Sequence, residues 1–289
     1  MGDTPAPRDR GTTPCVLAIA GSDSGGGAGI QADLKAFARC GVHGMTAITA
    51  ITAQSTAGVS AIHPVPAEIV LAQVRAVLAD IGVDAVKVGM LGTPEVAAAV
   101  AQAIDELPAG TPVVVDPVMV AESGARLLES QAQRALVELI LPRATVLTPN
   151  LPEARVLAGE PGPQADALPA ADEEGEAEAL AAAVLALGPR VVVLTGGHRE
   201  QAADLFVDSS APQAPVRIGG ERHLDGAAHG SGCTHSSVLA AELALGHSPL
   251  QAARTARELT GAAVARGLRE LGAGAGPVDV IDLERMRRS

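Results

Sequence analysis

The chain has 289 residues, of which 47% are hydrophobic and 19% are charged, and its formal net charge is −12. This composition is typical of a globular protein and excludes a disordered chain, and the negative charge disfavours nucleic acids and anionic membranes as partners. Two phenylalanines are the only aromatic residues, so a ligand ring would have to be held by aliphatic walls and hydrogen bonds.

Cysteine usage and hydropathy indicate a soluble, cytoplasmic protein. Three cysteines do not suit a disulfide scaffold, and we expect Cys15 and Cys40 to be small core residues in a reducing compartment. No apolar run is long enough to span a bilayer, and residues 1–13 lack the hydrophobic core of a signal peptide. We expect these first residues to form a disordered tail.

Short apolar runs alternate with helical patterns along most of the chain. In chain order, we expect strands at residues 15–20, 45–53, 85–88, 113–115, 145–147 and 191–194, and between them helices at 29–40, 67–81, 94–107, 131–139 and 177–187. Such alternation predicts βαβ units, and therefore an α/β fold in which helices cover both faces of a mostly parallel sheet.

The alternation is interrupted in two regions. Residues 159–176 are rich in Pro, Gly, Ala and acidic side chains, which predicts a surface loop leading into a helix. Residues 203–207 and 216–218 predict a hairpin, and helices are expected at 234–245 and 249–269. Because no internal repeat is present, we expect one domain over 14–280, followed by a loose tail over 281–289.

Several glycine-rich or acidic loops follow the predicted strands. In parallel α/β sheets, ligands bind in the loops at the carboxyl ends of the strands. The loops in question are 21–29, 89–92, 116–124, 148–153 and 196–198. Their shared position predicts one composite site.

The segment His229-Gly230-Ser231-Gly232-Cys233-Thr234 carries the most chemistry. It immediately precedes a predicted helix, whose N-terminal N–H groups and positive dipole end favour an anion such as phosphate. The same field is expected to lower the pKa of Cys233 and to make its thiol reactive. Phosphoryl transfer is one interpretation, and a glycine-rich loop beside a buried cysteine is the other.

Other loops offer groups that each have a structural alternative. The run from Gly21 to Gly29 fits neither a phosphate loop of the G-x-x-x-x-G-K-[ST] type nor a G-x-G-x-x-G fingerprint. Asp116 ends a strand, and Glu153 could hold a hydrated Mg²⁺ or simply offset a helix dipole. Gln54 could pair with an aminopyrimidine edge or lie in solvent.

The histidines support no zinc site, because no H-E-x-x-H motif or paired Cys/His spacing occurs. His229 and His235 lie on either side of Cys233. A Cys/His pair can be a nucleophile and its base, so a thiol hydrolase remains an alternative of a different class.

Taken together, these loops resemble the hydroxymethylpyrimidine and phosphomethylpyrimidine kinases of thiamine biosynthesis, which belong to the ribokinase-like superfamily. The matching segments follow the family order and are 18–35, 49–54, 87–91, 116–120, 148–154, 196–198 and 229–234. The resemblance implies a three-layer α/β/α ribokinase-like fold. It also implies a homodimer that uses ATP and Mg²⁺ to phosphorylate 4-amino-5-hydroxymethyl-2-methylpyrimidine and then its monophosphate.

The resemblance assigns roles to individual residues. Gln54 matches the glutamine that holds the aminopyrimidine, and Cys233 stands where ribokinase-type sugar kinases place their Asp base. The remaining pocket residues implied by the resemblance are Gly21, Asp33, Met90 and Val118. Gly230, Ser231 and Gly232 match the anion hole, Asn150, Thr195 and Gly197 the nucleotide site, and Glu153 with Asp116 the Mg²⁺ site.

Two positions depart from the family pattern. The family commonly has lysines where this chain has Glu122 and Thr195. Losing two cations near the phosphates could weaken the second phosphorylation, because its acceptor is already anionic. A pyridoxal kinase of the same family is the nearest alternative, because relatives with the same Cys motif phosphorylate that ring alcohol. A non-catalytic pyrimidine-binding regulator is a further one.

Overall fold

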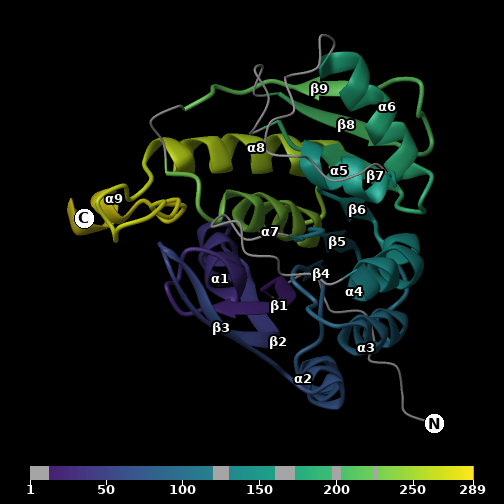
Figure 1. The fold of residues 1–289 in the computed structure, drawn as a ribbon, viewed down its shortest axis with the longest axis horizontal. Coiled ribbons are helices and arrows are strands. Elements are labelled where there is room, and N and C mark those ends of the chain that lie inside the picture. Colours follow the sequence, from purple (N-terminus) through teal and green to yellow (C-terminus); the bar gives the residue numbers. More distant parts are fainter. Residues whose placement is uncertain (1–12, 120–129, 160–172, 197–202, 224–226, 289) are drawn as a thin grey trace.

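One sheet of nine strands runs through the described part of the chain, in the order β3-β2-β1-β4-β5-β6-β7-β8-β9 (Figure 1). The computed structural model describes residues 13–119, 130–159, 173–196, 203–223 and 227–288. The strands are β1 (Cys15–Asp23), β2 (His43–Ser55), β3 (Gly58–Pro64), β4 (Ala85–Val88), β5 (Val113–Val115), β6 (Val146–Leu147), β7 (Val191–Leu194), β8 (Asp204–Asp208) and β9 (Val216–Ile218). Neighbours from β2 to β7 pair in parallel, and β2–β3, β7–β8 and β8–β9 are antiparallel.

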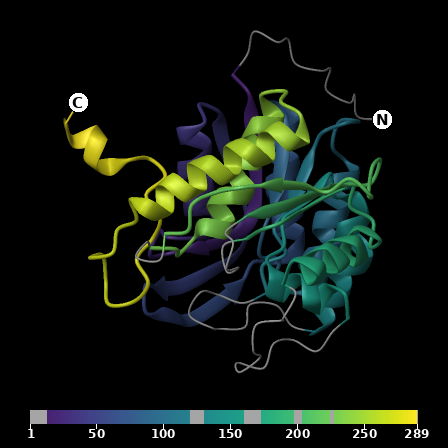
Figure 2. The same cartoon turned by 90° about the horizontal axis from the view of Figure 1, so that it is seen from above.

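Helices cover both faces of this sheet, as predicted (Figures 1 and 2). One layer contains α1 (Gly29–Arg39), α7 (Ser231–Ala244) and α8 (Pro249–Ala265), and the opposite layer contains α2 (Ala67–Asp80), α3 (Pro94–Asp105), α4 (Ser130–Ala135), α5 (Leu151–Leu157) and α6 (Glu173–Leu185). A π-helical turn at Leu136–Ile140 and a 3₁₀ turn at Leu141–Arg143 continue α4. No helix among the described residues has the length and apolar composition needed to cross a membrane.

Each central strand contributes to two hydrophobic cores, because successive side chains point to opposite faces of a sheet. In β1, Leu17 and Ile19 join the core under α2, α3 and α6, whereas Val16 and Ala18 join the core under α1 and α7. The same alternation in β4 turns Lys87 toward α1 and α7. The apolar runs that predicted these strands are buried on both sides, which explains why β4, β5 and β7 have the predicted bounds.

The predicted elements differ from the structure in a few places. Strand β3 was not predicted, and it pairs antiparallel with β2 at the sheet edge. Helix α8 ends at Ala265 rather than at Arg269, and beyond its end Gly267 lies so close to Ala227 that a Cβ would not fit there. The end of the predicted loose tail forms an exposed short helix, α9 (Leu283–Arg288).

Candidate active site

A cavity of about 400 Å³ opens at the carboxyl ends of the parallel strands. Loops that are far apart in the sequence meet there, which is the arrangement expected for a composite site. The predicted site residues that line it are Gly21, Gln54, Met90, Asp116, Val118, Asn150, Glu153, Thr195, Gly230, Ser231, Gly232 and Cys233. Gly197, His198 and Glu122 lie outside the described residues.

The segment around Cys233 begins helix α7, and we call Gly230–Gly232 the cradle. Gly230 is the N-cap, its backbone is left-handed with φ 80° and ψ 10°, and no side chain caps the helix. A Cβ at Gly230 would also overlap the carbonyl oxygen of Gly27. Glycine is therefore required here for its conformation and for the close approach of the first loop.

The state of the Cys233 thiol differs from the prediction. Burial raises the pKa of this thiol to about 12, and Asp116 and Asp33 add to the rise, although Lys87 and the N–H of Gly29 oppose it. The prediction of a lowered pKa is therefore wrong. The helix N-terminus favours a thiolate, but the loss of water around the sulfur outweighs that effect.

Asp33, which the resemblance assigns to the pocket, is not among the residues that line the cavity. It lies fully buried on α1, where its Oδ1 accepts hydrogen bonds from Lys87 Nζ at 2.9 Å and Ser237 Oγ at 2.7 Å. Lys87 itself lines the cavity, and its pKa lies above its usual value because Asp33, Cys233 and Asp116 together outweigh its desolvation. The signal for this buried cation was a single lysine inside the apolar run of β4.

Asn150 and Glu153 close the N-terminus of α5 as a capping box. The Glu153 N–H donates to Asn150 Oδ1 at 2.8 Å, and the Asn150 N–H donates to Glu153 Oε2 at 2.9 Å. The Asn-x-x-Glu spacing is the sequence signal for this motif. Both residues therefore combine a structural role with a place in the cavity wall.

Two carboxylates gather on this side of the cavity. Burial raises the pKa of Glu153 to about 8, and the neighbouring charge of Asp116 adds to the rise. Asp116 Oδ2 accepts a hydrogen bond from Ser236 Oγ at 3.0 Å. No cluster of three metal-ligating side chains occurs in the described segments. Two mutually repelling carboxylates without a third ligand fit a hydrated Mg²⁺ that also binds substrate phosphates.

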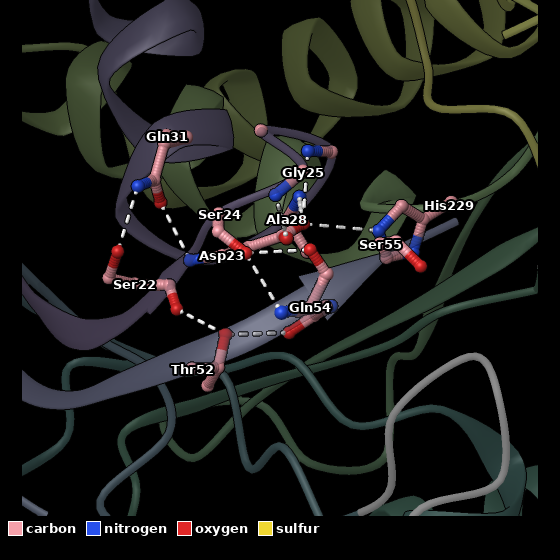
Figure 3. Close-up of polar contacts among 12 residues, drawn as sticks. Ser22, Asp23, Ser24, Gly25, Ala28, Gln31, Thr52, Gln54, Ser55 and His229 are labelled. Carbon is pink, nitrogen blue, oxygen red and sulfur yellow. Dashed lines mark hydrogen bonds and ion pairs between the residues drawn. The ribbon is translucent and has the colours of Figure 1, made fainter. Parts of the chain in front are cut away.

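Another part of the cavity lining comes from the first loop and β2, whose polar contacts are drawn in Figure 3. Ser24 Oγ donates to the Gln54 carbonyl at 2.6 Å and accepts from its N–H at 2.8 Å. Thr52 Oγ1 lies 2.6 Å from the Ser22 carbonyl and 3.2 Å from Gln54 Oε1. These bonds fix the backbone of Gln54 and orient its amide.

Because Gly21 has no side chain, it leaves room for the Met90 side chain in this part of the cavity. A Cβ at Gly21 would lie 2.5 Å from Met90 Cε. The backbone of Met90 is held from the other side, because Thr49 Oγ1 donates to its carbonyl at 2.6 Å. Met90 thus contributes an apolar side chain to the cavity lining, which Gln54 also joins.

Both histidines near Cys233 bond to carboxylates. His229 Nε2 lies 3.2 Å from Asp23 Oδ2, and His235 Nε2 lies 3.0 Å from Asp204 Oδ2. Among the described residues, neither imidazole is hydrogen-bonded to Cys233. This geometry does not favour the Cys/His pair that a thiol hydrolase needs.

Known protein families and individual relatives match most of this chain in sequence. Residues 23–279 match the protein family described as phosphomethylpyrimidine kinase. A hydroxymethylpyrimidine/phosphomethylpyrimidine kinase of Streptomyces coelicolor is 46% identical over 280 residues, covering 95% of this chain and 97% of the relative.

Two solved structures share the fold. The phosphomethylpyrimidine kinase of Clostridium difficile has a TM-score of 0.70 and 35% identity, covering 85% of this chain and 97% of that one. The pyridoxal kinase of Staphylococcus aureus in complex with AMP-PCP and pyridoxal has a TM-score of 0.80 and 33% identity, covering 95% and 96%.

Proposed function

The chain belongs to the phosphomethylpyrimidine kinase family and has its ribokinase-like fold, and on that premise we propose the reaction that it catalyses. It transfers the γ-phosphoryl group of ATP to the hydroxymethyl group of 4-amino-5-hydroxymethyl-2-methylpyrimidine. It then phosphorylates the resulting monophosphate. Both steps belong to thiamine biosynthesis.

One observation carries this proposal. A single cavity is lined by the cradle and Cys233 at the start of α7, and also by Gln54 and the apolar side chain of Met90. The aminopyrimidine would pair with the Gln54 amide, and Val118 would contact its ring. Its alcohol would then point toward Cys233. The relatives that are named as kinases of this pyrimidine support the choice of substrate.

The nucleotide would enter from the side of Asn150 and Thr195, both of which line the cavity. Asp116 and Glu153 would hold Mg²⁺, which supplies charge neutralisation for the phosphates when bound. Gly197 is proposed to complete the nucleotide site. The structure of a similar kinase with AMP-PCP supports nucleotide binding in this fold.

In the first transfer, the alcohol oxygen bonds to the γ-phosphorus while the bond from that phosphorus to the bridging oxygen breaks, and ADP leaves. Cys233 first releases its own thiol proton to solvent, because burial keeps the thiol protonated at neutral pH, and the resulting thiolate then accepts the alcohol proton. The cradle N–H groups stabilise charge on the transferring phosphoryl group, which is usually the larger contribution in this chemistry. In the second transfer, the acceptor is a phosphate oxygen that carries no proton to remove.

The mechanism therefore predicts that Cys233→Ala affects the two transfers unequally. The first should slow by about 10²–10⁴-fold, the usual contribution of a general base, whereas the second and the affinity for ATP should change little. Separate assays on the pyrimidine and on its monophosphate measure this. Wild-type turnover of the alcohol by the variant would remove Cys233 from the role of base.

The function itself is tested by MgATP-dependent kinase assays on the hydroxymethylpyrimidine, its monophosphate and pyridoxal. We expect turnover of both pyrimidines, and Gln54→Ala should raise the KM for the pyrimidine while leaving the KM for ATP unchanged. Preference for pyridoxal would favour the alternative suggested by the Staphylococcus aureus structure. No ATP turnover with any acceptor would refute the proposal.

We also propose that the enzyme is a cytoplasmic homodimer. The resemblance to the family supports this assembly and location. Light scattering of the purified protein should give twice the mass of one chain, which is 28.9 kDa. A mass of one chain at micromolar concentration would contradict the dimer.

A further inference from the structure

Two buried Asp–His pairs hold the start of α7, one on each side of Cys233. His229 precedes the cradle and pairs with Asp23, at the end of β1, and His235 follows Cys233 and pairs with Asp204, at the start of β8. All four side chains are at least nine-tenths buried. Buried carboxylates and imidazoles are costly unless they are paired, so a pattern that occurs twice around one thiol calls for an explanation.

Asp23 also organises the first glycine loop (Figure 3). Its Oδ1 accepts from the N–H of Gly25 at 2.8 Å, and its Oδ2 accepts from the N–H groups of Gly27 at 3.0 Å and Ala28 at 2.8 Å. His229 therefore joins the cradle to a carboxylate that already holds this loop.

The first glycine loop and the segment that carries His229 and the cradle pack closely against each other. A Cβ at Gly27 would overlap the His229 ring, and a Cβ at the cradle residue Gly230 would overlap the Gly27 carbonyl. Through Ser24, the loop also holds the backbone of Gln54. A chain of hydrogen bonds through His229, Asp23 and Ser24 thus links the cradle to Gln54, where the pyrimidine is proposed to bind.

Asp204 plays the corresponding part on the other side. Its Oδ1 accepts from the Gly196 N–H at 2.8 Å, next to Thr195, while its Oδ2 faces His235. Thr195 in turn forms a parallel β-bridge with Asn150, in which the Thr195 N–H donates to the Pro149 carbonyl at 2.8 Å. This pair therefore joins α7 to the proposed nucleotide loops.

We propose that Asp23–His229 and Asp204–His235 are positioning pairs that align the cradle with the acceptor site and the nucleotide site respectively. The inference rests on the proposed function. A displacement of about 1 Å between reacting groups can cost about 10²-fold in rate, so both alignments matter for turnover. The two pairs should have different kinetic signatures, because they connect to different substrates.

His229→Leu should lower kcat/KM for the pyrimidine by about 10–100-fold with the KM for ATP nearly unchanged, and His235→Leu should mainly raise the KM for ATP. The conservative variants His229→Gln and His235→Gln keep an N–H donor near the position of Nε2 and should recover most of the loss. His247→Leu is the matched control. It removes the pair between His247 and the Glu242 carboxylate, which lies at the far end of α7 from the cradle. Its kinetics should match the wild type.

Hydrogen exchange of the ligand-free protein gives a readout that does not depend on turnover. The amides of Gly25, Gly27 and Ala28 should exchange faster in His229→Leu, and the amide of Gly196 faster in His235→Leu. If the wild type phosphorylates no pyrimidine, the proposed function fails while exchange still decides whether the pairs hold the loops. Unchanged exchange, or equal losses in the Leu and Gln variants, would overturn the inference.

Discussion

At Cys233, burial and the helix N-terminus act on the thiol in opposite directions, and burial prevails. The consequence is a thiol that stays protonated at neutral pH in the ligand-free protein. Once deprotonated, a thiolate with such a high pKa is a strong base, which suits a proton acceptor better than a covalent nucleophile. Lys87, fully buried beside the cavity, is the cation that partly offsets this effect.

The thiol state can be measured by alkylation with iodoacetamide. Because the pKa of Cys233 is raised to about 12, its thiolate fraction at pH 7 is very small and should rise about tenfold for each pH unit up to pH 9. Peptide mapping by mass spectrometry would follow Cys233 separately from Cys40, whose pKa is raised to about 11. A rate for Cys233 that levels off below pH 8 would indicate the low pKa expected from the sequence.

The candidate site illustrates what a sequence can predict at the level of residues. Loops that follow the predicted strands placed Gly21, Asp116 and Asn150 at one cavity, because such loops in α/β sheets meet at the carboxyl edge. The burial of Asp33 under the cavity and the raised pKa of Cys233 depend on side chains from distant segments. No local pattern contains that information.

At the level of elements, apolar runs predicted the central strands because both of their faces are buried. Strand β3 has partly exposed or exposed residues throughout and no apolar run, so only its pairing with β2 makes it a strand. Helix α5 begins where Asn150 and Glu153 cap each other, and it is only seven residues long. Short helices depend strongly on their caps, because few internal hydrogen bonds support them.

Asn150→Ala should therefore destabilise the metal-free protein by about 1 kcal/mol, the usual cost of losing an N-cap acceptor. For a domain of this size, that corresponds to a decrease in Tm of about 2–4 °C in a thermal melt. Asn150→Ser is the control, since serine retains an N-cap oxygen. Equal melting temperatures for the Ala variant and the wild type would show that the capping box contributes nothing to stability.

At the level of the whole molecule, one ion pair connects three elements across the core. Lys87 on β4 bonds to Asp33 on α1, and Ser237 on α7 donates to the same carboxylate oxygen. Both charged side chains are fully buried. Breaking such a pair leaves an uncompensated buried charge, whereas replacing both partners removes the problem.

Lys87→Met should lower the free energy of unfolding by about 3–5 kcal/mol in urea titrations, because Asp33 loses its counter-ion. The double variant Lys87→Met, Asp33→Leu should recover most of that loss. A single variant as stable as the wild type would mean that Asp33 is neutral in the folded protein. Equal losses in the single and double variants would point to packing rather than charge.

The contacts that complete the cavity also have a consequence during synthesis of the chain. Asp23 meets His229 across 206 residues of sequence, and Asp33 meets Ser237 across 204. A ribosome must therefore translate most of the chain before β1 gains its α7 neighbour. Until then, α1 alone covers the apolar face of β1 that later also packs under α7, and the part left uncovered makes the nascent chain prone to aggregation. Slow translation of the segment between these partners should lengthen that exposed period and increase the dependence on chaperones.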